Sequence, residues 1–75
     1  MESQITNTVV EDEILFGLEN FGIDKSEIFQ RLEWAMKKTG IENLREREIS
    51  SLSGGQKQKV AIASIIALRP KILVL

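Results

Sequence analysis

The residues best suited to ligand chemistry form one short segment, Ser53-Gly54-Gly55-Gln56, which opens an unbroken helical stretch. The first N–H groups of a helix have no internal partner and point outward, at the positive end of the helix dipole. A helix that begins here therefore offers an anion site. The two glycines carry no side chain that would keep a phosphate away, and the Ser53 hydroxyl can cap the helix or bind the ligand. We call these four residues the glycine motif and interpret it as a candidate phosphate contact.

The same motif also fits an ordinary helix start. Gln56 lies three positions after Ser53, which is the spacing of a capping box, in which each side chain binds the other residue's backbone N–H. The glycines would then serve close packing. Lys57 and Lys59 follow in the next turn and add positive potential. The residue types alone leave the phosphate site and the plain cap both open.

The charge distribution and the missing residue types narrow the chemistry. All eleven acidic residues lie between Glu2 and Glu48, and the rest of the chain carries four basic residues and no acid. Such an asymmetry suits an anionic partner, although chance explains it equally well. The chain has no cysteine, which excludes a disulfide framework, a thiolate metal site and a cysteine nucleophile. It also has no histidine, the commonest general base and metal ligand.

Length and hydropathy place the chain among small soluble domains. Its 75 residues allow one small domain at most. No apolar run approaches the roughly 18 residues needed to span a bilayer. The N-terminus lacks a basic region followed by an apolar stretch, so no signal peptide is expected. These features predict a soluble, cytoplasmic protein.

The spacing of apolar residues predicts a first helix over residues 9–21. Residues four, four and three positions apart share one helical face: Val10, Ile14, Leu18 and Phe21. Thr8 and Glu11 fit a capping box at its start, and Gly22 fits the left-handed residue that ends such a helix. The acidic run 11–13 could suggest a metal site, but its position at the positive end of the dipole explains it better. We therefore expect no metal ligand.

A second helix is predicted over residues 25–39. Its apolar residues again share one face: Ile28, Leu32, Ala35 and Met36. Asp24 provides a start signal and Gly40 a stop signal. Two helices joined by a short link that contains glycine form a helical hairpin.

A third helix is predicted from the glycine motif to about Leu68. It is apolar almost all round, as is typical of a helix buried on most sides, and it has more apolar surface than a chain of this size can cover. Residues 72–75 form an apolar run without alternation, which favours an interior parallel strand. Residues 41–51 lack a clear period and are expected to form a turn or loop anchored by Leu44 and Ile49.

The glycine motif and its surroundings resemble a known family. Leu52 followed by the glycine motif matches the signature motif of ATP-binding cassette (ABC) ATPases. Residues 57–75 continue in the same way, with an apolar helix, a proline and an apolar strand. Residues 3–5 and 9–20 are similar to the ATPase subunits of cobalt and energy-coupling-factor (ECF) importers. The resemblance covers essentially the whole chain.

The resemblance implies a partial ABC ATPase domain that is mainly α. Residues 6–51 would be its helical subdomain, residues 52–68 the signature motif with its helix, and residues 72–75 the start of the Walker B strand of a P-loop NTPase α/β core. In the family, the signature motif of one ATPase subunit closes over the γ-phosphate of ATP held by a second subunit, which is an identical or a different chain. The contacts with this shared ATP would be Ser53, Gly54, Gly55 and Gln56.

The chain also departs from the complete family pattern. It contains no G-x-x-x-x-G-K-[ST] phosphate loop and no switch histidine. The magnesium-associated Asp and the catalytic Glu of the family would follow Leu75, and Gln4 is not the Q-loop glutamine. We therefore assign no catalytic residue. We expect this chain neither to bind Mg²⁺ nor to hydrolyse ATP alone.

Trp34 is the candidate contact for a membrane partner. It is predicted to lie on the polar face of the second helix, away from Leu32 and Met36, and an exposed aromatic suits a partner surface. In the family, the helical subdomain meets the transmembrane coupling subunit, which would place the protein at the cytoplasmic face of the membrane. The alternative is that Trp34 packs against other parts of the ATPase. No aromatic accompanies the basic residues after Glu48, so no nucleic-acid partner is expected.

Three functions remain open at this point. The first is a fragment of the ATP-binding subunit of an ECF or cobalt-type importer, and the second is a fragment of a non-transport ABC ATPase. The third is a non-catalytic interaction peptide or a truncated gene product. The similarity over residues 9–20 favours the first. The transported substrate is not encoded here, because specificity lies in the membrane partner.

Overall fold

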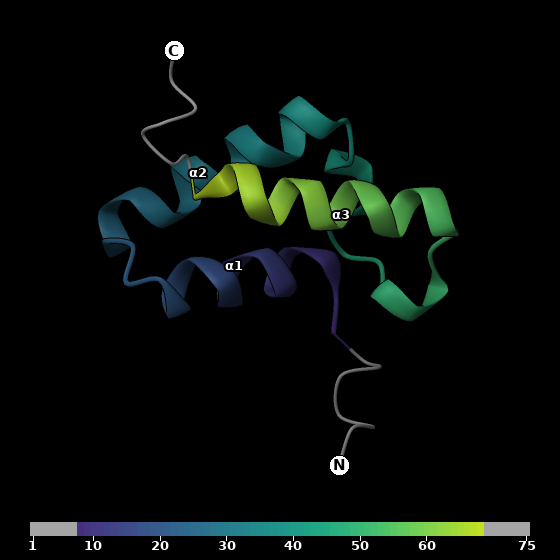
Figure 1. The fold of residues 1–75 in the computed structure, drawn as a ribbon, viewed down its shortest axis with the longest axis horizontal. Helices are drawn as coiled ribbons and strands as arrows, with labels where there is room; N and C mark the ends of the chain where they lie inside the picture. The colour runs from purple at the N-terminus through teal and green to yellow at the C-terminus, as the bar shows by residue number, and fades with distance from the viewer. Residues whose placement is uncertain (1–7, 69–75) are drawn as a thin grey trace.

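Three helices joined by a compact connection make up the fold, as seen in the computed structural model, which describes residues 8–68 (Figure 1). Helix α1 spans Val10–Asn20 and α2 spans Lys25–Thr39. Two short 3-10 turns, η2 (Glu42–Leu44) and η3 (Ile49–Ser51), lead into α3 (Gly54–Ala67). The mainly α class expected from the sequence is confirmed, whereas the strand predicted over residues 72–75 lies outside the described residues. No helix among residues 8–68 has the length and apolar character needed to cross a membrane.

The first two helices end on glycines, as their sequences predict. Gly22 and Gly40 have φ values of 72° and 71°, which L side chains rarely adopt. After α1, the Ile23 N–H donates to the Leu18 carbonyl at 3.1 Å and the Gly22 N–H donates to Glu19 at 3.0 Å. The residues after α2 repeat this pattern, which is a Schellman motif. Each helix therefore ends through bonds within its own last turn.

The start of α1 differs from the prediction. No side chain caps it, so the capping box proposed for Thr8 and Glu11 is wrong. Instead, the Val10 N–H donates to the Arg47 carbonyl at 3.0 Å, and the Glu11 N–H donates to Arg45 at 3.0 Å. Carbonyl groups of the connection before α3 thus accept hydrogen bonds from the first N–H groups of α1. These N–H groups therefore need no side-chain cap.

The start of α2 differs in a smaller way. Asp24 occupies the N-cap position, as predicted, but its side chain makes no capping bond to the backbone. Its carboxylate accepts a hydrogen bond from the Ser26 hydroxyl at 2.8 Å.

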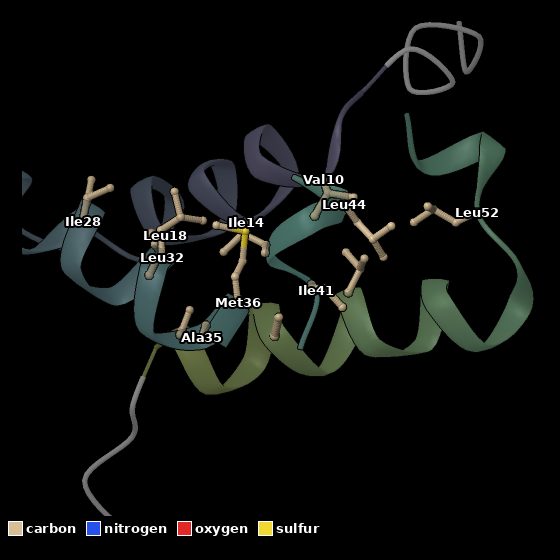
Figure 2. Packing of buried hydrophobic residues seen from close by; sticks show 13 residues of the cluster. Val10, Ile14, Leu18, Ile28, Leu32, Ala35, Met36, Ile41, Leu44 and Leu52 are labelled. Atoms are coloured by element: carbon tan, nitrogen blue, oxygen red, sulfur yellow. The ribbon is translucent and has the colours of Figure 1, made fainter. Parts of the chain in front are cut away.

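All three helices contribute to one hydrophobic core (Figure 2). The most buried large side chains include Ile14 and Leu18 from α1 and Leu32 and Met36 from α2, each at most 1% exposed. The side chains that α3 buries are smaller: Val60, Ala63 and Ala67. The connection adds three buried residues: Ile41, Leu44 and Leu52. Leu44 is therefore an anchor as expected, and the half-buried Ile49 packs against the same core.

Three aromatic side chains and part of α3 remain outside this core. Phe21 was predicted to share the buried face of α1, but it is 71% exposed because the helix ends at Asn20 and Phe21 lies in the reversing turn. Phe16 and Phe29 are also exposed. On α3, Ile62 and Ile65 are 44% and 59% exposed. The apolar surface predicted for this helix is therefore only partly covered by residues 8–68.

Candidate functional site

The candidate site is the N-terminus of α3, where the glycine motif forms the first turn. Ser53 is the N-cap, with extended backbone (φ −70°, ψ 168°). Its Oγ accepts a hydrogen bond from the Gln56 N–H at 3.1 Å, and the Gln56 Oε1 accepts one from the Ser53 N–H at 2.9 Å. The predicted capping box is therefore present. It is also the only helix start with a side-chain cap among the described helices.

The capping box leaves the two glycine N–H groups for another partner. Gly54 and Gly55 occupy the first two helical positions, whose N–H groups have no acceptor within the helix. The Ser53 hydroxyl accepts from Gln56, yet its own hydrogen can still be donated to a ligand. The first turn thus offers two backbone donors and one side-chain donor. The Gln56 Oε1 is used within the cap.

The space around both glycines is open. A Cβ added at Gly54 or at Gly55 would meet nothing within 4 Å, and neither residue has a positive φ. Close packing among residues 8–68 therefore does not explain these glycines, contrary to the simpler interpretation of the motif. Each costs about 1 kcal/mol relative to alanine in a helix interior, and somewhat less at an end.

The electrostatics of this end favour an anion. The first turn of α3 contains no acidic residue, unlike those of α1 and α2. Lys57 and Lys59 are exposed on the same helix. The helix dipole adds about half a positive charge at its N-terminus. Among residues 8–68, no three acidic side chains gather in a group that could hold a metal ion.

Comparison with known protein families assigns nearly the whole chain to one of them. The family profile described as ABC transporter matches residues 2–75, which is nearly the entire chain. The chain belongs to the ABC transporter family. The glycine motif lies within the matched residues.

The most similar ABC proteins found belong to one group. The energy-coupling factor transporter ATP-binding protein EcfA1 of Bacillus subtilis (strain 168) is 45% identical over 74 residues. Those residues are 99% of this chain and 26% of the relative. The protein of the same name from Clostridioides difficile (strain 630) is 49% identical over 73 residues, which cover 97% of this chain and 26% of that protein. The chain thus spans about a quarter of the length of these relatives.

Trp34 is placed differently from the prediction. It is half-buried and packs against the hydrophobic core, so its ring does not point fully away from the apolar face of α2. The Lys38 Nζ lies 6.0 Å from the ring centroid, within the range of a cation–π contact. The prediction failed because helical spacing places a side chain relative to its own helix but says nothing about the neighbouring elements.

Two arginines that the sequence did not single out tie the elements together. Arg45 binds Glu33 on α2 through two hydrogen bonds of 2.7 Å, and it lies 3.5 Å from Glu11 on α1. The hydrogen bond from Arg45 lowers the pKa of Glu33, and the same bond raises the pKa of Arg45. Arg31 of α2 binds the last carbonyls of α3. Neither pairing has a local sequence signal, because the partners lie 12 or more positions apart.

Proposed function

We propose that this chain supplies the signature motif of an ECF-type importer ATPase, and that the motif binds the γ-phosphate of ATP held by a second ATPase subunit. The Gly54 and Gly55 N–H groups and the Ser53 hydroxyl would donate to the phosphate oxygens. Gln56 would maintain the turn through the capping box. The same assembly would include a transmembrane coupling subunit, which would bring the chain to the cytoplasmic face of the membrane.

The open space around Gly54 and Gly55 supports this proposal most directly. The residues described here give no steric or conformational reason for glycine at either position. Alanine would stabilise the helix at both. A ligand that must approach the backbone N–H groups closely supplies the missing reason, since a Cβ would stand in its way.

The chemistry of the donors suits a phosphate that is shared between subunits. N–H groups at a helix start and a hydroxyl donate to anionic oxygens, and such charge-assisted bonds are about twice as strong as neutral ones. In the family, the phosphate loop of the partner subunit holds the nucleotide that a signature motif contacts, so the partner would bind the rest of the ATP. In the intact family site, Mg²⁺ neutralises charge on the phosphates, and no residue of this chain is proposed to bind it.

The part of Trp34 that reaches the surface is proposed as a contact with the transmembrane subunit. Its ring rests on the core on one side, which orders it at little further entropic cost. The relatives are named as ATP-binding proteins of energy-coupling factor transporters, and such a transporter is the assembly in which this partner would occur.

The test uses a chimera in which this chain replaces the matching segment of the Bacillus subtilis relative. Gly55→Asp places a carboxylate against the phosphate, and ATP-driven uptake by the assembled transporter should fall to background. Gly55→Ala adds only a methyl group and should lower uptake while leaving the melting temperature unchanged or higher. Gly17→Ala is the matched control, because an added Cβ at Gly17 also meets nothing and this glycine lies within α1.

The outcomes separate the phosphate site from a plain helix cap. A plain cap predicts normal uptake for Gly55→Asp, since an acid in the first turn is favoured by the dipole. Normal uptake with unchanged melting would overturn the proposal. Loss of uptake in the Gly17→Ala control would show that the chimera is sensitive to any change in helix stability.

A further inference from the structure

The C-terminal end of α3 lacks the device that ends the other two helices. Both α1 and α2 are followed by a glycine with positive φ, at Gly22 and Gly40. Leu68 follows α3 with helical backbone (φ −72°, ψ −21°), and the last turn of α3 contains no basic residue. The free carbonyls and the negative dipole end of α3 therefore need a partner from elsewhere.

Arg31 of α2 supplies that partner. Its Nη1 donates to the Ala67 carbonyl at 3.2 Å and to the Leu68 carbonyl at 2.5 Å. Its Nε donates to the Glu27 carboxylate at 3.1 Å, one turn earlier on α2. The Arg31 side chain is only 20% exposed, which limits competition from water. A guanidinium that binds on both sides is fixed in direction as well as in place.

Side-chain packing at this end of α3 is less directional than a hydrogen bond. Beyond Val60, the side chains that α3 fully buries are Ala63 and Ala67, which have little volume to interlock with a neighbour. Ile66 and Leu68 are half-buried and pack against the core through apolar contacts. Arg31 is thus the strongest directional contact at the C-terminal end of the helix.

The opposite end of the same helix carries the glycine motif. The 14 residues of α3 span about 21 Å at 1.5 Å per residue. A rigid tilt of about 3° at one end moves the other end by about 1 Å over that length. Hydrogen bonds to a phosphate have a useful distance range of only about 0.5 Å, and a misplacement of about 1 Å can cost up to about 100-fold in rate.

We propose that Arg31 is a positioning residue for the glycine motif: by binding the last carbonyls of α3, it sets the direction in which the Gly54 and Gly55 N–H groups point. The first part of this proposal, which we call the orientation part, is that Arg31 sets the direction of α3, and it rests on the observed hydrogen bonds alone. The second part, which we call the functional part, is that this direction affects ATP-dependent activity, and it rests on the proposed phosphate contact. Two measurements separate these parts.

The first measurement is the direction of α3 in the isotope-labelled chain, from residual dipolar couplings of backbone N–H groups. Arg31→Gln removes the charge and the forked donor. It should tilt α3 relative to α2 by at least about 3°, the tilt that moves the far end of the helix by about 1 Å. Arg31→Lys keeps a cation with a single donor position and should tilt α3 less. Arg45→Gln is the matched control, because Arg45 is also partly buried and ion-paired, but its ion pairs join it to α1 and α2 rather than to α3. It should leave the direction of α3 unchanged.

Two results would overturn the orientation part. One is the same direction of α3 in Arg31→Gln as in the unaltered chain. The other is loss of the folded signals in both Arg31 variants, which would make Arg31 a general determinant of stability. Neither result depends on whether the glycine motif binds phosphate.

The second measurement is ATP turnover by the chimeric transporter described above. Arg31→Gln should lower the maximal rate about tenfold and leave the KM for ATP nearly unchanged, because the partner subunit holds the nucleotide. Arg31→Lys should recover part of the rate. A tilt of α3 with normal turnover would retain the orientation part and refute the functional part. If Gly55→Asp is also fully active, the phosphate contact itself is refuted.

Discussion

The two ends of helix α3 satisfy their free backbone groups in different ways. At the N-terminus, Ser53 and Gln56 cap each other within four residues of sequence. At the C-terminus, the Ala67 and Leu68 carbonyls are bound by Arg31, which lies 36 and 37 positions earlier. The first end is therefore complete once the helix forms, whereas the second end is complete only when α2 and α3 have packed together.

This difference separates the chemistry of the candidate site from its orientation. The donors of the site come from a turn whose geometry is set by its own residues. The direction in which those donors point depends on a contact made at the far end of the helix. In such a site, the geometry of the donors stays constant while the direction in which they point changes with the packing of α2.

The largest expected effect comes from weakening that packing. Leu32 is completely buried on α2, one position after Arg31. Leu32→Ala should lower the free energy of unfolding by about 2–5 kcal/mol, because it removes buried methyl groups and leaves a cavity. Urea unfolding followed by circular dichroism measures the loss. Ile62→Ala is the control, since Ile62 is 44% exposed on α3, and it should change stability far less.

The same variant tests whether the ends of α3 differ as described. Amide hydrogen exchange should accelerate more at Leu68, whose carbonyl Arg31 binds, than at Gln56, whose N–H is held by Ser53. Equal acceleration at the two amides would show that the capping box also depends on the packing of α2. It would contradict the claim that the two ends of α3 are stabilised in different ways.

A smaller effect is expected at the locally determined end. Ser53→Ala removes the hydroxyl that accepts the Gln56 N–H, and it should cost about 1 kcal/mol of stability. Thermal melting of the chain measures this change. Ser26→Ala is a suitable control, because the Ser26 hydroxyl binds only the exposed Asp24 side chain. A destabilisation at Ser53 no larger than at Ser26 would mean that the capping box adds nothing to the fold.

The smallest effect concerns the ion pair that joins α2 to the connection. The hydrogen bond from Arg45 holds the pKa of Glu33 below its ordinary value of 4.5. The ionised Glu33 therefore adds stability above that value, and this share is lost as the pH falls through the lowered pKa. The Glu33 side chain is 52% exposed and water screens the pair, so the share should be below about 1 kcal/mol.

The difference in stability between the unaltered chain and Glu33→Gln isolates this pair from the other carboxylates. That difference should be present at pH 6 and should shrink toward zero as the pH falls below 4.5 and through the lowered pKa of Glu33. Since the hydrogen bonds described for Glu33 go to Arg45 of the connection and not to α3, hydrogen exchange at Gln56 and Leu68 should respond equally to its loss. A selective effect at Leu68 would show that the ion pair also supports the end held by Arg31.

The sequence predicted the elements of this fold well where their signals are local. The three helices were expected over 9–21, 25–39 and from the glycine motif to about Leu68, and each begins and ends within one residue of those limits. Gly22 and Gly40 terminate the first two helices as predicted, because a left-handed residue is needed there and glycine adopts it without strain. The capping box of the glycine motif was also identified correctly.

The errors share a different origin. Thr8 was expected to cap α1, but segments 8–11 and 45–49 pair through their backbones and fulfil that role. Trp34 was assigned to the polar face of α2, but it is half-buried and packs against the core to which all three helices contribute. In each case the deciding partner lies many positions away, and a helical period cannot identify it.

The sequence by itself determined where the helices begin and end and which turn exposes free N–H groups, because caps and glycine stops act over three to six residues. Only the tertiary structure decided how α1 is capped, which face of α3 is buried and which group holds its last carbonyls. These features depend on contacts between elements, since a buried backbone group takes whichever partner the packed chain brings within hydrogen-bonding distance. The donors of the candidate site could therefore be identified from four consecutive residues. The contact of Arg31 with the end of α3, which we propose sets the direction of those donors, is a property of the packed helices and could not be identified in this way.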